Sequence, residues 1–374
     1  MVNHFGNYHQ LQSPLYMAMH DPVLHQFISY LDEKKRQQEH DPSVHIRIEL
    51  SREFIDQVRE SFKQHILQGE FQLHALAHVL SSHFLKGGFD LHSNAIGLLP
   101  GGDNRPFHIR ERIARQMLFS LTDLDLGNQM IGHFRYNTNT GWFPLLLSAN
   151  FVEYIPRDHP ATGVNRLTSR VKAEEELWNK VTDEMFVLDT IVNRDKHFMQ
   201  YSKYVKDIFG IKIVCEDEQA CLRVHEELRK LDTTQCDWTP FDTDIVPARR
   251  GALEQRRGPL LSFVETKDYL TCGPSEQKKT GWKAIKSVVR WREQLFEIQV
   301  QPLSNYYLEI DHMSGPSHQS FKLTRDALRT ELAEKIPLYG FYRGLLRMLF
   351  LKEEISFEYE KASIVILEST AAKE

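Results

Sequence analysis

The chain has 374 residues, of which 41% are hydrophobic and 26% are charged. This length is sufficient for two domains with separate cores, and the composition is ordinary for a globular protein. The formal net charge of -5 provides no overall electrostatic attraction to nucleic acid or to an anionic membrane. Any phosphate binding must therefore depend on local basic clusters.

The sequence shows no membrane segment and no secretory leader. No stretch approaches the roughly eighteen uninterrupted apolar residues that a membrane span needs. The first ten residues also lack the charged and then apolar order of a signal peptide. We therefore expect a cytoplasmic protein without a membrane partner. The four cysteines form no C-x-x-C pair and are expected to be reduced thiols.

Residues 1–155 are expected to form a mainly helical N-terminal domain of unknown role. Residues 45–50 alternate as a half-buried strand does, and residues 54–85 have the pattern of one or two helices. An apolar stripe with helical spacing is formed by Leu24, Phe27, Ile28 and Leu31. We expect this stripe to pack in a core rather than to serve as a docking face.

Three histidines lie in the second half of the predicted helical stretch. His74 and His78 are four residues apart, so a helix can place both imidazoles on one face. The segment reads His-Ala-Leu-Ala-His, however, and lacks the Glu that follows the first His in the zinc metalloprotease motif. The pattern, with His83 further on, favours packed histidines over metal ligands.

The next segments are expected to connect the N-terminal domain to a second one. Residues 87–105 contain several Gly, Pro, Asp and Asn residues and indicate a surface connector, without the Lys-Ser/Thr ending of a P-loop. Residues 109–121 predict a helix, and short strands are expected near residues 133–136 and 143–147. Residues 156–163 are typical of a loop, and we expect the domain boundary there.

Three cations occur where a second domain, residues 160–325, is expected to begin. A strongly helical stretch starts at Ser169, with Arg170 and Lys172 at or before its N-terminus, where backbone N–H groups also favour an anion. Lys180 would lie about 15 Å further along the helix axis. The three cations could therefore follow an extended polyphosphate. A charged surface helix is the alternative.

Asp207 precedes a short β-branched run that is typical of a buried strand. A carboxylate at the mouth of a strand can hold Mg²⁺, which accepts one or two carboxylates together with water and phosphate oxygens. A turn or cap residue is the alternative interpretation. The basic segment from Arg249 to Arg257 could guide nucleotide or RNA, or it could be a solvated insertion.

Residues 284–291 and 294–301 are expected to pair as a hairpin. In the second strand, Glu297, Gln299 and Gln301 alternate with apolar residues, so they are expected to share one face. Such a face suits a binding site, although any half-exposed strand has the same pattern. Residues 306–310 are expected to be extended, and residues 326–374 to form a C-terminal extension of helix and strand that packs on the core.

The order of these motifs resembles the synthetase domain of the RelA/SpoT family, which makes (p)ppGpp alarmones. The resemblance covers residues 160–325, under half of the chain. The similar segments are Ser169-Arg170-Val171-Lys172 with Lys180, Asp207-Ile-Phe-Gly210-Ile-Lys212, Lys267-Asp268-Tyr269, Lys278-x-x-Gly281-Trp282 and Phe296-Glu297-Ile298-Gln299-Val300. The resemblance implies an α+β fold in which a mixed β-sheet is flanked by helices, as in nucleotidyltransferases.

The family's activity would be Mg²⁺-dependent transfer of pyrophosphate from ATP to the 3′-hydroxyl of GTP or GDP. By resemblance, Asp207 and Glu297 would be the catalytic and metal-binding carboxylates. The residues expected to bind nucleotide are Arg170, Lys172, Lys180, Lys212, Lys278, Trp282 and Gln299. The oligomeric state and any activating signal are not indicated by the sequence.

The chain departs from the family at several positions of this expected site. Ala284 and Lys286 stand where the family has Ser and His, and Lys212 and Gln301 stand where it has Arg. These differences leave guanine specificity open. The acceptor could be another nucleotide, such as an adenine nucleotide, or a tRNA 3′ end. The domain could also be a nucleotide-binding sensor without turnover.

Overall fold

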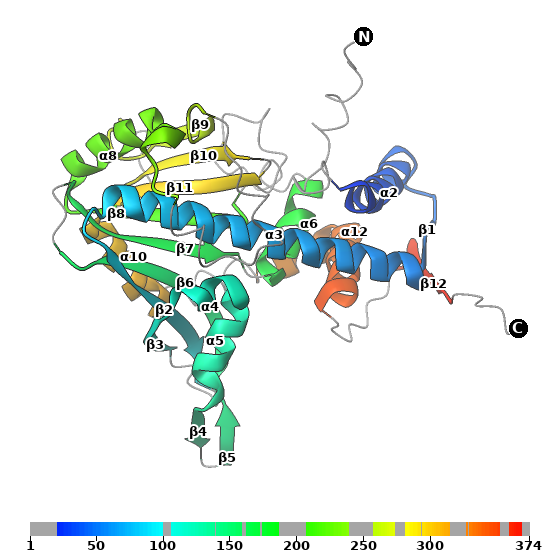
Figure 1. Ribbon diagram of the computed structural model, residues 1–374. Coiled ribbons are helices and arrows are strands. Elements are labelled where there is room, and N and C mark those ends of the chain that lie inside the picture. Colours follow the sequence, from blue (N-terminus) through cyan, green and yellow to red (C-terminus); the bar gives the residue numbers. More distant parts are fainter. Residues whose placement is uncertain are drawn as a thin grey trace, which may run out of the picture. The chain divides into compact units, whose positions relative to one another are not determined.

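The computed structural model describes residues 21–99, 106–138, 140–158, 162–172, 174–186, 207–238, 257–273, 281–292, 294–314, 327, 329–351 and 359–368 (Figure 1). The chain divides into two compact units, each assembled from segments that are far apart in the sequence. Unit 1 comprises Met1–Leu67, Ala173–Val205 and Lys322–Glu374. Unit 2 comprises Gln68–Lys172 and Lys206–Phe321.

Unit 2 contains a mixed sheet of eight strands in the order β3-β2-β6-β7-β8-β11-β10-β9. The strands are β2 (Phe89–Leu98), β3 (Pro106–Ile113), β6 (Leu146–Pro156), β7 (Val164–Val171), β8 (Phe209–Cys215), β9 (Ser262–Asp268), β10 (Ile285–Trp291) and β11 (Gln294–Pro302). Neighbouring strands are antiparallel except for β8 and β11, which are parallel. The predicted α+β class with a mixed sheet is confirmed, as is the pairing of residues 284–291 with 294–301.

One face of this sheet is apolar and carries the core of unit 2. Alternate residues of the central strands, such as Ile211, Phe296 and Ile298, are fully buried on this face. Helix α8 (Glu218–Lys230) packs against β8 and β11 and lies on the same side of the sheet as α3 (Arg52–Phe84) in Figure 1. The burial of apolar side chains at helical spacing along α8 explains why this segment forms a helix on the sheet.

The opposite face of the sheet is polar and is partly covered by α10 (Leu303–Ser314). The Tyr306 hydroxyl on this helix donates a hydrogen bond of 2.6 Å to Glu153 of β6. Arg166 and Arg110 also bind the Glu153 carboxylate, at 2.9 and 2.8 Å. Burial raises the pKa of Glu153, but Tyr306 and the two arginines outweigh it and hold the pKa below its ordinary value. An ionic network thus attaches α10 to the sheet.

Unit 1 has a small parallel sheet of β1 (Ile46–Ser51) and β12 (Ala362–Leu367) with several helices. The helices are α2 (Pro22–His40), the first part of α3, α6 (Glu174–Met185) and α12 (Pro337–Leu346), which leads into a π-helical turn, Arg347–Leu351. Aromatic side chains fill its core, with Trp178 stacked on Phe350 at 3.7 Å between ring centroids. The predicted stripe that begins at Leu24 is buried, as expected. Among the described helices, none is both long enough and apolar enough to cross a membrane.

Two expectations between residues 87 and 121 are wrong, whereas the strands expected near residues 133–136 and 143–147 are present. Strand β2 occupies most of the predicted connector, and β3 replaces the start of the predicted helix 109–121. The pattern Phe107, Ile109, Ile113 has the period of a strand, and a helix, α4 (Arg115–Ser120), begins only after it. The remaining elements are α5 (Asp123–Gly132), β4 (Arg135–Thr138), β5 (Gly141–Pro144) and a short 3₁₀ turn, Thr233–Gln235.

The expected domain boundary at residues 156–163 joins two neighbouring strands, β6 and β7, of the unit 2 sheet. The N-terminal part of the chain therefore supplies strands β2, β3 and β6 to this sheet, instead of a separate helical domain. The C-terminal residues 326–374 belong to unit 1, together with the first 67 residues. The sequence alone does not reveal this arrangement, because each unit is built from segments that are far apart in the chain.

The contact between Gly69 of α3 and Phe209 at the start of β8 provides a test of this packing. A Cβ atom added to Gly69 would overlap the Phe209 ring, so we expect Gly69→Ala to cost about 2 to 3 kcal/mol of unfolding free energy. Gly132→Ala is the control, since nothing lies within 4 Å of its added Cβ, and it should change stability by less than about 1 kcal/mol. Urea unfolding of both variants measures the difference. Equal stability would contradict the packing described here.

Candidate functional site

The polar face of the sheet gathers most of the predicted site residues that the structure describes. In the sheet register, Arg170 of β7 pairs with Gly210 of β8, and Gly210 pairs with Glu297 of β11. Two residues further along, Lys212 pairs with Gln299, which pairs with Lys286 of β10. Paired residues point to the same face of a sheet, so these two rows form one polar surface. Asp207 lies two residues before β8, beside the first row.

Both predicted carboxylates of this surface bind lysines. Asp207 Oδ2 accepts a hydrogen bond from Lys172 Nζ at 2.8 Å. Glu297 forms a close ion pair with Lys286 and also accepts a hydrogen bond of 2.5 Å from the Gln299 amide. The Glu297 side chain is only 9% exposed, and its charge requires a partner in this setting. The two ion pairs therefore keep the cluster electrically neutral.

Lys286 interacts with both carboxylates. Burial lowers the pKa of this lysine, but the nearby charges of Glu297 and, more weakly, Asp207 raise it above the ordinary value. Lys286 is thus fixed as an ammonium ion between the two acidic groups. The hydroxyl of Tyr269 also contributes to this shift, which places Tyr269 near the same cluster.

Gly210 leaves an open position in the centre of this surface. A Cβ atom added there meets only the carbonyl oxygen of Arg170, at 3.8 Å. Arg170 and Glu297 flank Gly210 on the adjacent strands, so their backbones are about 10 Å apart. A phosphate group can approach the sheet over Gly210 with a cation on one side and the carboxylate cluster on the other.

A second network surrounds Glu309 of α10. Its carboxylate accepts hydrogen bonds from Lys212 at 2.7 Å, Gln301 at 2.8 Å and the Trp282 indole at 2.9 Å. Burial raises the pKa of Glu309, but the charge of Lys212 and these three hydrogen bonds bring it below the ordinary value. Glu309 therefore holds Lys212 and the edge of Trp282 in place. Asn305 completes the network by donating to Gln301 at 2.7 Å.

Trp282 and Tyr269 form an aromatic pair next to the charged cluster. Their ring centroids are 5.7 Å apart with an interplanar angle of 60°. Both side chains are half-buried, and the Tyr269 N–H donates to the Ala284 carbonyl at 2.9 Å. Half-buried aromatic rings beside a charged polar surface are of the kind that can stack on a nucleobase.

The side chains of Asp207 and Glu297 are of the type that Mg²⁺, the predicted cofactor, requires. Asp207, two residues before β8, and Glu297 of the adjacent strand β11 offer carboxylate oxygens, which Mg²⁺ accepts together with water and phosphate oxygens. Lys172 and Lys286 already neutralise these oxygens. The residues fit Mg²⁺ when a nucleotide polyphosphate is also present, because the phosphates can then take over the two ammonium groups.

The structure does not bring all of the predicted residues together. Lys180 lies on α6 in unit 1, whereas Arg170 and Lys172 lie in unit 2. The prediction that a helix begins at Ser169 is wrong, since β7 continues to Val171 and α6 begins at Glu174. Residues 164–171 pair with β8 and, in part, with β6, and this pairing replaces the expected helix.

Two further predictions lie outside the described residues. Lys278 is one, so its contribution to an acceptor site stays a prediction. The basic segment from Arg249 to Arg257 is the other, except for Arg257 itself, which is exposed.

The sequence interpretation missed or undervalued three residues of these networks. Lys286 was treated as a departure from a family pattern, but it pairs with Glu297. Glu309 was placed in a stretch expected to be extended, and that expectation is wrong. The spacing of Leu303, Tyr306 and Ile310 is helical and could have identified α10. Tyr269 was quoted as part of a motif without a role.

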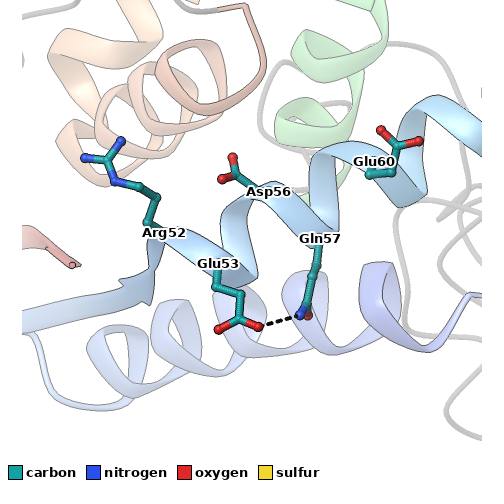
Figure 2. Close-up of a pocket in the computed structure, with 5 residues that line it drawn as sticks. All are labelled: Arg52, Glu53, Asp56, Gln57 and Glu60. Carbon is teal, nitrogen blue, oxygen red and sulfur yellow. Dashed lines mark hydrogen bonds between the residues drawn. The ribbon is translucent and has the colours of Figure 1, made fainter. Parts of the chain in front are cut away.

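A shallow hollow on unit 1 has a different character. Figure 2 shows it along the first turns of α3, where Gln57 donates a hydrogen bond to Glu53. Its lining residues are Arg52, Glu53, Asp56, Gln57 and Glu60. Three of the five are acidic, and Arg52 is paired with Glu368 at 2.9 Å. This surface repels phosphates and is not a nucleotide site.

The sequence matches no protein-family model and no curated protein. Solved structures include similar chains, among them small alarmone synthetase 1 from Bacillus subtilis bound to its product pppGpp, with 19% identity and a TM-score of 0.24 over 47% of this chain and 79% of that chain. A GTP pyrophosphokinase family protein from Streptococcus pneumoniae has 14% identity and a TM-score of 0.26 over 51% of this chain and 73% of that chain. Likeness at this level carries no functional conclusion, so function must be argued from the site.

The Glu309 network predicts a pH dependence of stability. A carboxyl group with a lowered pKa stabilises the fold above its unfolded pKa of about 4.3, and this contribution is lost as the pH falls through the folded pKa. We expect Glu309→Gln to lose about 2 kcal/mol at neutral pH, because Lys212 then lacks its partner. Urea unfolding of the wild type and the variant, from pH 7 to about pH 3.5, measures the difference in their free energies of unfolding. The difference from the wild type should shrink below about pH 4.3, and a constant difference would contradict the assignment.

Proposed function

We propose that the polar face of unit 2 binds nucleotides and transfers pyrophosphate from ATP to a ribose hydroxyl of an acceptor nucleotide. The observation that carries the proposal is that two carboxylates and three cations lie around the open position at Gly210. The carboxylates are Asp207 and Glu297, and the cations are Lys172, Lys286 and Arg170. Phosphoryl chemistry requires this combination, because it depends on positioning and on neutralising phosphate charge.

The lysines have a specific part in this proposal. In the structure described here, Lys172 and Lys286 are bound to carboxylates. When a triphosphate binds, the two ammonium groups turn to its oxygens, and Asp207 and Glu297 become available for Mg²⁺. Lysine suits this exchange because its ammonium is a point charge on a flexible stem. Arg170 binds a phosphate from the other side of Gly210.

Transfer requires one bond to form and one to break at the β-phosphorus of ATP. The acceptor hydroxyl oxygen bonds to this phosphorus, and the bond to the oxygen of the α-phosphate breaks, so that AMP leaves. Glu297, held by Gln299, accepts the hydroxyl proton in this scheme. Mg²⁺, when bound by Asp207 and Glu297, neutralises charge on the transferred group. The remaining cations position the phosphates.

The aromatic pair Trp282 and Tyr269 is the proposed base-binding platform. Glu309 fixes the Trp282 indole, so the ring is held before a base arrives. By resemblance the acceptor is GTP or GDP, with Lys212 and Lys278 near its phosphates. Stacking accepts any base, and Ala284 offers no side-chain hydrogen bond, so an adenine nucleotide or an RNA 3′ end is the alternative acceptor.

A second candidate function is nucleotide sensing without turnover. The pairing of Lys286 with Glu297 favours it, because a half-buried ammonium bound to the proposed catalytic base opposes both metal binding and proton transfer. Nucleotide binding by the same residues would be retained. The two functions differ only in whether product forms.

Removing either carboxylate separates the two functions. We expect Asp207→Asn and Glu297→Gln to lower transfer at least about 10³-fold, because each removes a charge that the reaction needs. The assay uses γ-labelled ATP, Mg²⁺ and each candidate acceptor (GTP, GDP, GMP, ATP, ADP and uncharged tRNA), followed by product separation. Glu218→Gln, which removes a surface ion pair with Lys283, is the control. Transfer at the wild-type rate in either site variant would refute the transferase proposal. Nucleotide binding without product formation by the wild type would support the sensor proposal instead.

The exchange of Lys286 between carboxylate and phosphate is also testable. We expect Lys286→Met to weaken binding of a non-hydrolysable ATP analogue about tenfold, by losing one phosphate contact worth about 1.4 kcal/mol. The same variant should bind Mg²⁺ more tightly without nucleotide, because Glu297 loses its internal cation. Lys267→Met, at the paired position on β9, is the matched control, since that lysine binds Glu265. Calorimetric titration measures both affinities, and no change in either would refute the exchange.

A further inference from the structure

A buried cluster of metal-ligating side chains lies where α3 meets α5 in unit 2, on the apolar side of the sheet. It consists of Glu70 and His74, one helical turn apart on α3, and Asp123, the first residue of α5. Their exposed fractions are 5%, 0% and 4%. The nucleotide site proposed above uses none of these residues. Two carboxylates in such a setting need compensating positive charge.

The distances within the cluster are those of a metal site. His74 Nε2 lies 3.1 Å from Asp123 Oδ1 and 3.8 Å from Glu70 Oε1. All three ligand atoms lie within 4.8 Å of one another. Ligands at about 2.1 Å from a metal ion are about 3 to 3.5 Å from each other, so small movements would close this set around an ion.

Two of the three side chains, His74 and Asp123, have no hydrogen-bond partner for their polar atoms. Neither ring nitrogen of His74 makes a hydrogen bond, and neither do the two carboxylate oxygens of Asp123. Buried polar groups normally have partners, so an imidazole with no exposed surface, directed between two carboxylates, points to a missing ligand.

The surroundings hold the ligands in position. The backbone N–H of Asp123 donates to Glu70, so one ligand is oriented by the backbone of another. The Asn150 amide on β6 donates to the Asp123 carbonyl at 2.6 Å, and Thr122 caps α5. Because these contacts join α3 to α5 and α5 to β6, the ligands approach one another with little freedom.

We propose that Glu70, His74 and Asp123 bind one divalent transition-metal ion that fastens α3 to α5. One imidazole and two carboxylates form a mixed nitrogen and oxygen set, which suits Zn²⁺ and similar ions better than Ca²⁺. The role is structural, since the side chains are buried and no substrate reaches them. Glu70 follows Gly69, which contacts Phe209 at the start of β8, so the ion also stabilises the strand that follows Asp207.

The test measures metal in the purified full-length protein. After removal of metal with a chelator, one equivalent of Zn²⁺ is added, excess is removed by gel filtration, and the content is measured by mass spectrometry. We expect about one Zn²⁺ per chain and a rise in melting temperature of several degrees. X-ray absorption at the zinc edge should show nitrogen and oxygen ligands without sulfur. Less than about 0.1 Zn²⁺ per chain, or sulfur ligands from a cysteine, would overturn the proposal.

Matched variants locate the ion. Glu70→Gln keeps the side-chain volume and should lower zinc affinity at least about tenfold while the protein remains folded by circular dichroism. His74→Ala should abolish zinc binding, and zinc-edge absorption of the wild type still decides the question if this variant does not fold. His83→Ala removes a histidine of the same helix that is bound to Glu227 at 2.7 Å, and it should bind zinc as the wild type does. Unchanged affinity in Glu70→Gln would refute the site. None of these measurements involves nucleotide, so the outcome is independent of the transferase proposal.

Discussion

The parallel pairing of β8 with β11 is the constraint on which the nucleotide site depends. It places Gly210 beside Glu297 and Lys212 beside Gln299 on one face of the sheet. These strands are nearly 80 residues apart in the sequence, and no local interaction brings them together. The apolar residues that alternate with them, such as Ile211 and Ile298, are buried on the other face, so burial fixes the register. A shift of one residue would direct the site residues into the core.

On the polar face of the sheet, acidic side chains are paired with basic ones, whereas on the opposite face apolar side chains are buried. Three carboxylates there have cationic partners: Glu153 binds Arg166, Glu297 binds Lys286, and Glu309 binds Lys212. Arginine with Tyr306 makes a fixed structural network at Glu153, whereas lysines make the pairs near Gly210. Because lysine pairs are easier to exchange than bidentate arginine contacts, the proposed function resides where the sheet uses lysine. The buried cluster at Glu70 follows the same rule, with a metal ion as the proposed partner.

Much of the site could be predicted from the sequence, because apolar and polar residues alternate in the strands and because the motifs follow one another in a recognisable order along the chain. The polar side of β11 with Glu297 and Gln299, the strand after Asp207 and the hairpin of β10 and β11 were predicted and are present. The contributions of Lys286, Glu309 and Tyr269 were not predicted, because they depend on contacts with residues of other elements. The helix expected from Ser169 was wrong because the flanking strands β6 and β8 hold residues 164–171 as a strand, against their helical pattern.

The sequence by itself determined the fold class, the apolar stripes and the residue types available for phosphate chemistry. These follow from local periodicity and composition, which act within a few residues. Only the tertiary structure decided that β2, β3 and β6 join the same sheet as β8 and β11, and that Lys180 belongs to the other unit. It also decided which carboxylate meets which cation, as in the convergence of Glu70, His74 and Asp123. Pairing between distant segments depends on burial and hydrogen bonds that exist only once the chain has folded, so no local pattern records it.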